Sequence, residues 1–127
     1  MRHPEFEFQK AVCNYLRLQY PNVLFLSDTV ASVKLTMPQA ARNKAIQKEG
    51  IKTPDLIIFQ PNELYHGLFI ELKIETPFKK DGQLKSNEHL EGQSKTIVSL
   101  NELGYKATFA WSFDQAKQII DDYINLM

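Results

Sequence analysis

Hydrophobic residues recur along the chain with two spacings, which predict two kinds of element. Steps of three and four residues predict helices over residues 4–19, 86–103 and 114–127, and a helix-forming composition that ends before Gly50 predicts one over 37–49. Short apolar runs bounded by turn-forming residues predict strands over residues 22–28, 55–60, 67–73 and 105–111. The segment between residues 28 and 37 is ambiguous. The order of helices and strands, without repeats or an internal linker, predicts an α/β sandwich formed by one domain over residues 1–127.

Local signals support these boundaries. Pro4 suits a first helical turn, Gly104 ends the third helix, and Ser112 is a suitable cap for the last. The connection over residues 61–66 suits a hairpin between the two central strands. We expect the first helix to bury a stripe formed by Phe8, Ala11, Val12, Tyr15 and Leu16. We expect the third helix to bury Leu90, Ile97, Leu100 and Leu103.

Composition excludes several classes of protein. Of the 127 residues, 43% are hydrophobic, and there are only 5 Gly and 6 Pro, which argues against disorder and collagen-like repeats. A single cysteine, Cys13, forms no internal disulfide and no multi-cysteine metal site, which fits a reducing compartment. No apolar run approaches the roughly 20 residues that span a bilayer, and no signal-type segment follows Met1. We therefore expect a cytoplasmic protein without a membrane partner.

Charge is balanced overall but unevenly distributed. The 15 basic and 15 acidic side chains give a net charge of zero. Residues 29–53 nevertheless carry five basic side chains against Glu49 alone: Lys34, Arg42, Lys44, Lys48 and Lys52. This stretch is our candidate for contacts with DNA phosphates, and the alternative is a solvated basic surface.

Two acids and a lysine are expected to meet at the central hairpin. Asp55 begins one strand, and Glu71 and Lys73 end the next on a shared face, because alternate residues of a strand point the same way. Folding the hairpin brings Asp55 opposite residues 71–73, although a shift of one residue in register would change its face. Neighbouring carboxylates repel unless a cation separates them, and Mg²⁺ prefers oxygen ligands. The alternative is a cross-strand ion pair on the sheet surface.

Two further polar residues fall on inward stripes of predicted helices. Gln93 lies on the stripe of the third helix, unless it is at a frayed start of that helix. Glu5 continues the stripe of the first helix better than Glu7, and either acid could simply favour the helix dipole.

Other residues carry weaker signals. The three histidines, His3, His66 and His89, lack metal-site spacing and are interpreted as surface residues. Trp111 is expected to pack in the core, and the absence of a glycine-rich phosphate loop argues against nucleotide hydrolysis.

These residues together resemble the virus-type replication-repair nuclease (VRR-NUC) domain of the PD-(D/E)xK nuclease superfamily. The resemblance covers nearly the whole chain: Glu5-x-x-Phe8-Gln9, Gly50-x-x-x-Pro54-Asp55-Leu56, Phe69-Ile70-Glu71-Leu72-Lys73, Gln93 and Leu103-Gly104-Tyr105. Thr53 departs from the pattern, because a small apolar residue usually precedes the Pro-Asp pair. The resemblance implies a restriction-endonuclease-like α/β sandwich, with a central mixed β-sheet flanked by helices.

The resemblance also implies a chemistry. Asp55, Glu71 and the Leu72 carbonyl would hold Mg²⁺ or Mn²⁺, and Glu5 would complete the site directly or through water. Lys73 would orient the nucleophile, and Gln93 would position Lys73 or a phosphate oxygen. The expected activity is structure-specific DNA endonuclease cleavage that leaves 5′-phosphate and 3′-hydroxyl ends, on branched DNA such as a Holliday junction or a flap.

The expected setting is a phage or prophage system of replication, recombination and repair in a bacterial host cell. The alternatives are a non-catalytic DNA-binding or assembly module that keeps the nuclease fold, and a restriction-type endonuclease. Paired cuts in a four-way junction need two sites, so we expect a homodimer. Part of its interface is expected at Val30, Val33, Leu35 and Met37, although these side chains could equally pack against their own sheet.

Overall fold

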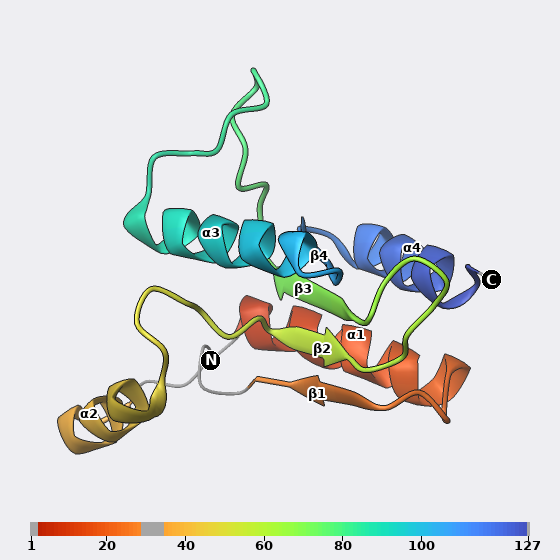
Figure 1. Ribbon diagram of the computed structural model, residues 1–127, viewed down its shortest axis with the longest axis horizontal. Helices are drawn as coiled ribbons and strands as arrows, with labels where there is room; N and C mark the ends of the chain where they lie inside the picture. Colours follow the sequence, from red (N-terminus) through yellow and green to blue (C-terminus); the bar gives the residue numbers. More distant parts are fainter. Residues whose placement is uncertain (1–2, 29–34, 127) are drawn as a thin grey trace.

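A four-stranded mixed sheet forms the centre of the structure, a computed structural model that describes residues 3–28 and 35–126. The elements in chain order are α1 (Pro4–Gln19), β1 (Phe25–Ser27), α2 (Met37–Ile46), β2 (Leu56–Ile58), β3 (Leu68–Leu72), α3 (Glu88–Glu102), β4 (Lys106–Ala110) and α4 (Phe113–Ile124) (Figure 1). Each of these elements lies within, or within one residue of, a segment predicted from the hydrophobic pattern. The predicted fold class, an α/β sandwich with a mixed sheet, is therefore confirmed.

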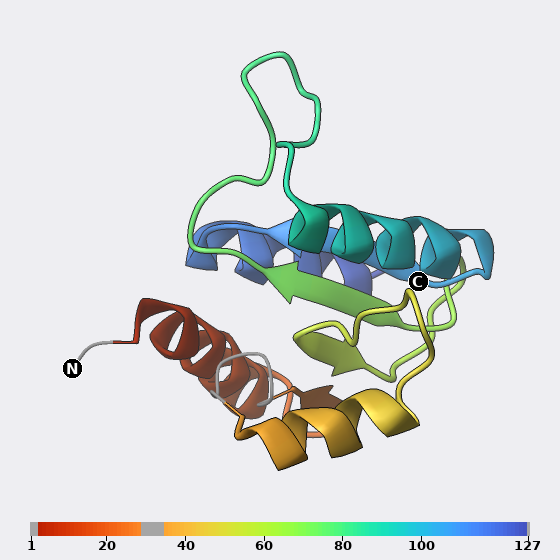
Figure 2. The same ribbon diagram turned by 90° about the vertical axis from the view of Figure 1, so that its left-hand side faces the viewer.

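The strands lie in the sheet in the order in which they occur in the chain. β1 pairs with β2, and β2 with β3, in antiparallel fashion, whereas β3 and β4 are parallel. A parallel pair needs a crossover, and α3 supplies it. α1 and α4 pack against each other, and α3 lies on the opposite side of the sheet from α4 (Figure 2). The sheet is thus covered by helices on both faces.

The main core lies between the sheet and the α1–α4 pair. Val12 and Leu16 of α1 pack with apolar residues of β2, β3 and α4 in one buried cluster. In β3, Leu68 and Ile70 are fully buried, and the intervening Phe69 is half-buried. A strand that is covered on both faces has a nearly continuous run of apolar residues, and this run is the pattern from which β3 was predicted. Glu71, which lies in the same strand, is therefore an acidic residue buried within an apolar run.

Turn chemistry sets the ends of these elements. In the hairpin between β2 and β3, the Asn62 side-chain oxygen accepts hydrogen bonds from the backbone N–H groups of Leu64 (2.9 Å) and Tyr65 (2.8 Å). Ser112 accepts a hydrogen bond from the Gln115 N–H and caps α4, as predicted. Gly104 follows α3 with a φ of +96°, and a Cβ there would lie 2.7 Å from the His66 ring. Glycine is required at that position on both counts.

Three details of the predicted helices were wrong. Ala11 is exposed, and Cys13 takes its place on the buried stripe of α1. Leu103 is 67% exposed because α3 ends one residue earlier, so it is not part of the inward face. The predicted helix over 37–49 is shorter, since α2 ends at Ile46. Among the residues described, no helix combines the length and the apolar character needed to cross a membrane.

Two segments project from this body. α2 buries none of its residues and lies apart from the sheet, and the connection between β3 and α3 extends away from it (Figures 1 and 2). Val30 and Val33, which were expected at a dimer interface, and Lys34, which was expected to contact DNA, lie outside the described residues.

Candidate active site

The register of the central hairpin places Asp55 beside Glu71. Leu56 pairs with Ile70, so the preceding Asp55 faces Glu71 across the strands. The Leu72 N–H donates to a carboxylate oxygen of Asp55 (2.8 Å), and the Asp55 N–H donates to Oε1 of Glu71 (3.2 Å). Asp55 is 9% exposed and Glu71 is 2% exposed. The two acids are held by the sheet backbone itself, so they do not form a simple surface ion pair.

Burial makes the charged forms of both acids unfavourable. Burial raises the pKa of Glu71 to about 9, and the nearby Asp55 carboxylate adds to this rise. Burial also raises the pKa of Asp55, although the hydrogen bond from Leu72 opposes the shift. Lys73 lowers the pKa of both acids without cancelling the effect of burial. The surroundings therefore favour the protonated form of Glu71, and holding both acids ionised requires an additional positive charge.

Two buried oxygen atoms near this pair lack hydrogen-bond partners. Among the described side chains, Glu71 Oε2 and Gln93 Oε1 are the buried polar atoms without one. Unsatisfied buried acceptors are rare and call for a missing donor or cation. Two carboxylates with a free oxygen fit a divalent cation such as Mg²⁺, which prefers oxygen ligands. In residues 3–28 and 35–126 no three His, Cys, Asp or Glu side chains gather, so Glu5 does not join the two acids directly.

Gln9 of α1 holds the strand ends that carry the acids. Its side-chain Nε2 lies 2.6 Å from Ser27 Oγ, 2.7 Å from the Asp28 carbonyl and 3.3 Å from the Asp55 carbonyl. Sequence reasoning gave this residue no role in the site. The available signal was its position four residues after Glu5 and three before Val12, on the buried stripe of the helix.

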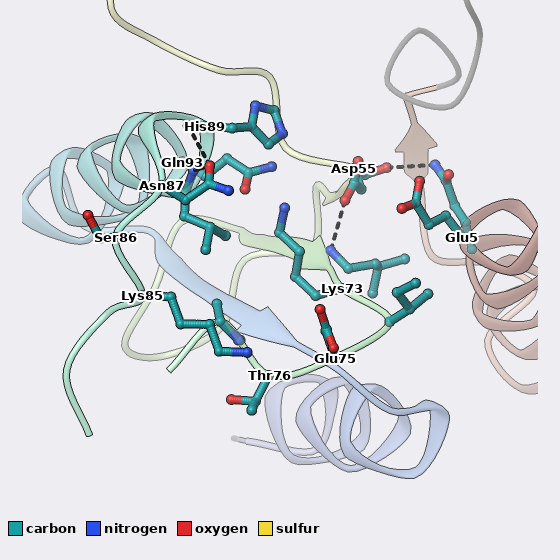
Figure 3. A pocket seen from close by; sticks show the side chains of 15 residues that line it. Glu5, Asp55, Lys73, Glu75, Thr76, Lys85, Ser86, Asn87, His89 and Gln93 are labelled. Atoms are coloured by element: carbon teal, nitrogen blue, oxygen red, sulfur yellow. Dashed lines mark hydrogen bonds between the residues drawn. The ribbon is translucent and has the colours of Figure 1, made fainter. Parts of the chain in front are cut away.

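Two cavities reach the acids from different sides. One, of about 490 Å³, is lined by Glu5, Lys73 and the segment 74–77, together with the start of α3 (Figure 3). The other, of about 940 Å³, is lined by Glu71 and by the chain from α2 to Thr53. Asp55, His89 and Gln93 line both cavities. The two cavities therefore adjoin at these shared residues beside the end of β3, and together we call them the hollow.

A comparison with solved structures finds a similar fold. One solved structure, a "VRR_NUC domain protein", superposes on the chain with a TM-score of 0.63, covering 99% of this chain and 92% of that chain at 25% sequence identity. The chain has a VRR-NUC domain. No protein-family model and no curated protein matches the sequence. The VRR-NUC domain places the chain among nucleases, in agreement with the resemblance carried by its motifs.

The first helix of this VRR-NUC domain presents Glu5 to the site. Glu5 is exposed and lines the cavity that contains Lys73, whereas Glu7 does not line it. Figure 3 shows Glu5 facing the cavity from α1, with Lys73 and Gln93 approaching from β3 and α3. Gln93 is 5% exposed, which confirms that it points inward. The described part of the chain thus brings five predicted residues to one hollow: Glu5, Asp55, Glu71, Lys73 and Gln93.

His89 also belongs to this hollow, which sequence reasoning did not foresee. It is exposed, as predicted, but it lines both cavities from the first turn of α3, where the Asn87 side chain accepts its N–H (2.9 Å). Partial burial lowers the pKa of its imidazole, and the positive charges of Lys73 and Lys52 act in the same direction. Its spacing from other histidines carried no signal of this placement.

Only some of the residues predicted to contact DNA lie close together beside the site. Lys44, Lys48 and Lys52 are exposed and line the larger cavity of the VRR-NUC domain. Arg42 is exposed on α2 without lining that cavity, and Lys34 lies outside the described residues.

Proposed function

We propose that the protein is a metal-dependent, structure-specific DNA endonuclease that hydrolyses phosphodiester bonds in branched DNA, such as a Holliday junction or a flap. The observation that carries the proposal is the buried pair of acids Asp55 and Glu71, which lies near Lys73. Oε2 of Glu71 in this pair has no hydrogen-bond partner. The VRR-NUC domain supports nuclease chemistry in general. The proposed setting is phage-type replication, recombination and repair.

Asp55 and Glu71, with the Leu72 carbonyl, are the groups we propose to hold Mg²⁺ or Mn²⁺. Such an ion lowers the pKa of bound water and neutralises charge on the phosphate. Lys73 lies beside both acids and supplies a positive charge to orient the attacking water and stabilise the phosphorane-like transition state. The unpartnered Gln93 Oε1 can accept a hydrogen bond from Lys73 or from that water, and Glu5 contributes through water.

Conservative changes at the acids test this proposal. We expect Asp55→Asn and Glu71→Gln to abolish cleavage of labelled junction, flap and duplex DNA while leaving DNA binding intact, because each removes a metal ligand and little volume. Lys73→Ala is expected to slow cleavage by roughly 10²- to 10⁴-fold, the usual effect of removing one positioned catalytic group. All cleavage should stop in EDTA.

Glu75→Gln is the matched control, because Glu75 lines the same hollow but is exposed. This variant should cleave within about two-fold of the unchanged protein. Undiminished cleavage in EDTA, or full activity of Glu71→Gln, would refute the assignment. Metal-independent DNA binding without any cleavage would instead identify a binding module that keeps the nuclease fold.

A further inference from the structure

The connection between β3 and α3 contains a structured projection, residues 77–85, which we call the arm. The Lys79 N–H donates to the Gln83 carbonyl (2.7 Å), and the Lys85 N–H donates to the Pro77 carbonyl (2.9 Å). An isolated antiparallel bridge joins Phe78 to Leu84. The arm is therefore a short hairpin, and both ribbon views show it standing clear of the rest of the molecule (Figures 1 and 2).

The base of the arm is anchored in the body. Pro77 is almost fully buried. The ring of Phe78 packs edge-on against Phe109 and Trp111, with ring centroids 5.9 and 5.7 Å apart. Such aromatic pairs add stability beyond the burial of apolar area. The arm is thus held at a defined angle to the sheet.

The far end of the arm is positively charged. Lys79 and Lys80 are exposed, and neither forms a salt bridge with any residue in 3–28 or 35–126. The neighbouring Asp81 carboxylate accepts the Gln83 N–H (3.0 Å), which turns it toward the arm's own backbone. The two ammonium groups are therefore available to an anionic partner.

The arm is continuous with the candidate active site at both ends. It begins four residues after Lys73, and the residues at its base, including Thr76 and Lys85, line the hollow (Figure 3). Lys79 and Lys80 lie beyond these lining residues, on the part of the arm that stands clear of the molecule (Figures 1 and 2). They are therefore placed to meet phosphates other than the one in the hollow.

We propose that the arm binds the phosphate backbone of the DNA duplex that leaves the active site on one side of the cleaved bond. This inference rests on the proposed nuclease function and assigns to the arm the double-stranded part of the substrate. The contact is independent of base sequence, because flexible lysines bind phosphate as point charges and read no base edge here.

The test compares Lys79→Ala/Lys80→Ala with a control that loses the same charge. Arg17→Ala/Lys106→Ala serves as the control, because Arg17 lies in the last turn of α1 and Lys106 near Tyr65, away from the hollow. Binding of labelled branched DNA is measured in EDTA over a range of salt concentrations. We expect the arm variant to bind roughly ten-fold more weakly and to lose about two units of salt slope relative to the control, with KM raised more than kcat is lowered.

Substrate length gives the second half of the test. Duplexes are shortened to about two base pairs on one side of the cut and then on the other. Shortening the side that the arm contacts should bring the arm variant within about two-fold of the control, and shortening the other side should not. Lys79→Glu/Lys80→Glu should enlarge the defect on long duplexes only.

The outcomes separate this inference from the nuclease proposal. If the unchanged protein cleaves DNA and both arm variants match the control on every substrate, the arm proposal is wrong and the nuclease proposal stands. If the unchanged protein neither binds nor cleaves DNA, both proposals are wrong.

Discussion

Glu71 is the residue at which folding and proposed function oppose each other. Its carboxyl group is 2% exposed, it lies beside a second acid, and one oxygen has no partner. An apolar residue would suit this position in β3 better, since burying a charge is costly unless it is paired. The conflict explains why the pKa of Glu71 rises to about 9. In the metal-free protein this group is therefore mainly protonated at neutral pH.

This pKa predicts a pH dependence of stability. A carboxyl group with a higher pKa in the folded chain than in the unfolded chain favours folding most at low pH, below its unfolded value of 4.5. That contribution is lost as pH rises toward about 9. We expect the free energy of unfolding in EDTA to decrease from pH 5 to 9. Glu71→Gln should make this decrease smaller and should raise the free energy of unfolding by about 1–3 kcal/mol at pH 8.

Denaturant titrations at several pH values measure this effect, and Glu75→Gln is again the control, since its side chain is exposed. A Glu71→Gln protein less stable than the unchanged protein at pH 8, without metal, would contradict the prediction.

The place of a site residue could be predicted from the sequence where its partners are close to it along the chain. Asp55 and Glu71 meet across one hairpin, so the strand pattern and a turn suffice to bring them together. Gln9 contacts the Asp55 carbonyl 46 residues away, and no local pattern contains that partner. His89 was missed for the same reason, because the cavity it lines is formed by several elements.

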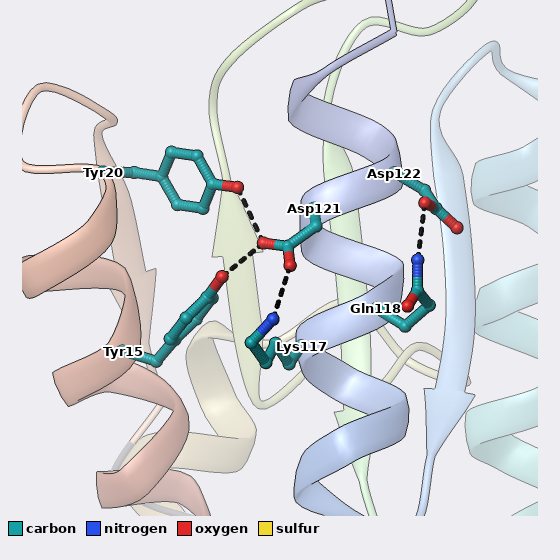
Figure 4. A network of polar contacts seen from close by, with 6 residues as sticks. All are labelled: Tyr15, Tyr20, Lys117, Gln118, Asp121 and Asp122. Carbon is teal, nitrogen blue, oxygen red and sulfur yellow. Dashed lines mark hydrogen bonds and ion pairs between the residues drawn. The ribbon is translucent and has the colours of Figure 1, made fainter.

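At the scale of elements, α1 and α4 are joined by a polar network at the edge of the core. One carboxylate oxygen of Asp121 accepts hydrogen bonds from the hydroxyls of Tyr15 and Tyr20 (2.7 Å for Tyr20), and the other pairs with Lys117 at 2.9 Å (Figure 4). Lys117 also lies over the Tyr15 ring. Burial alone would raise the pKa of Asp121, but the hydrogen bonds from these partners outweigh it and lower the pKa.

Removing this carboxylate should loosen the pairing of the two helices. We expect Asp121→Ala to cost roughly 1–3 kcal/mol, since two part-buried hydroxyls lose their acceptor. Because the Asp121 pKa is lowered on folding, its contribution is present above pH 4 and lost as pH falls, so the two proteins should converge in acid. Asp122→Ala is the control: Asp122 accepts only the exposed Gln118 amide in the described structure, and its loss should cost less than about 0.5 kcal/mol.

α2 is the element whose role depends most on a partner. It carries a capping box, in which Thr36 accepts the Gln39 N–H and the Gln39 side chain accepts the Thr36 N–H, yet it buries no residue. We propose that it contacts DNA phosphates. Arg42→Ala/Lys44→Ala/Lys48→Ala should weaken binding to all DNA sequences and reduce the salt slope by about one unit for each phosphate that is no longer neutralised.

The control for α2 replaces three basic residues elsewhere: the exposed Lys10 and Arg17 and the half-buried Lys106. If the two triple variants bind DNA with equal affinity and equal salt dependence, α2 is only a solvated basic surface.

Elements were more predictable than their connections. Helices and strands follow from hydrophobic spacing and caps within each segment, and the eight predicted elements are all present. The arm was not predicted, although Asp81-Gly82 is a local turn signal and Gly82 has a φ of +86°. The anchoring of its base was beyond local patterns, because Phe78 packs against Phe109 and Trp111, some 30 residues further along the chain. Trp111 was expected in the core, but it is half-buried outside the main core cluster and packs against Phe78 at the base of the arm.

At the scale of the whole molecule, we propose a homodimer. A four-way junction needs two symmetric cuts, and a two-fold dimer supplies two sites in fixed relation. Of the proposed interface, the structure describes Leu35 and Met37, and Met37 is 87% exposed. Light scattering at micromolar concentration should give twice the 14.7 kDa chain mass. A cruciform plasmid should be linearised by paired cuts, and monomer mass with only nicked circles would contradict the proposal.

The sheet order β1-β2-β3-β4 has a consequence for how the molecule is made on the ribosome. Each strand pairs with the one synthesised just before it, so the sheet can grow strand by strand without threading a late segment between earlier ones. The two acids can meet as soon as β3 emerges, before α3 and β4 have left the exit tunnel. The apolar face of α1 is covered only after α4 has followed. Nascent chains would therefore bring Asp55 and Glu71 together on an open core, before Gln93 and His89 of α3 join them.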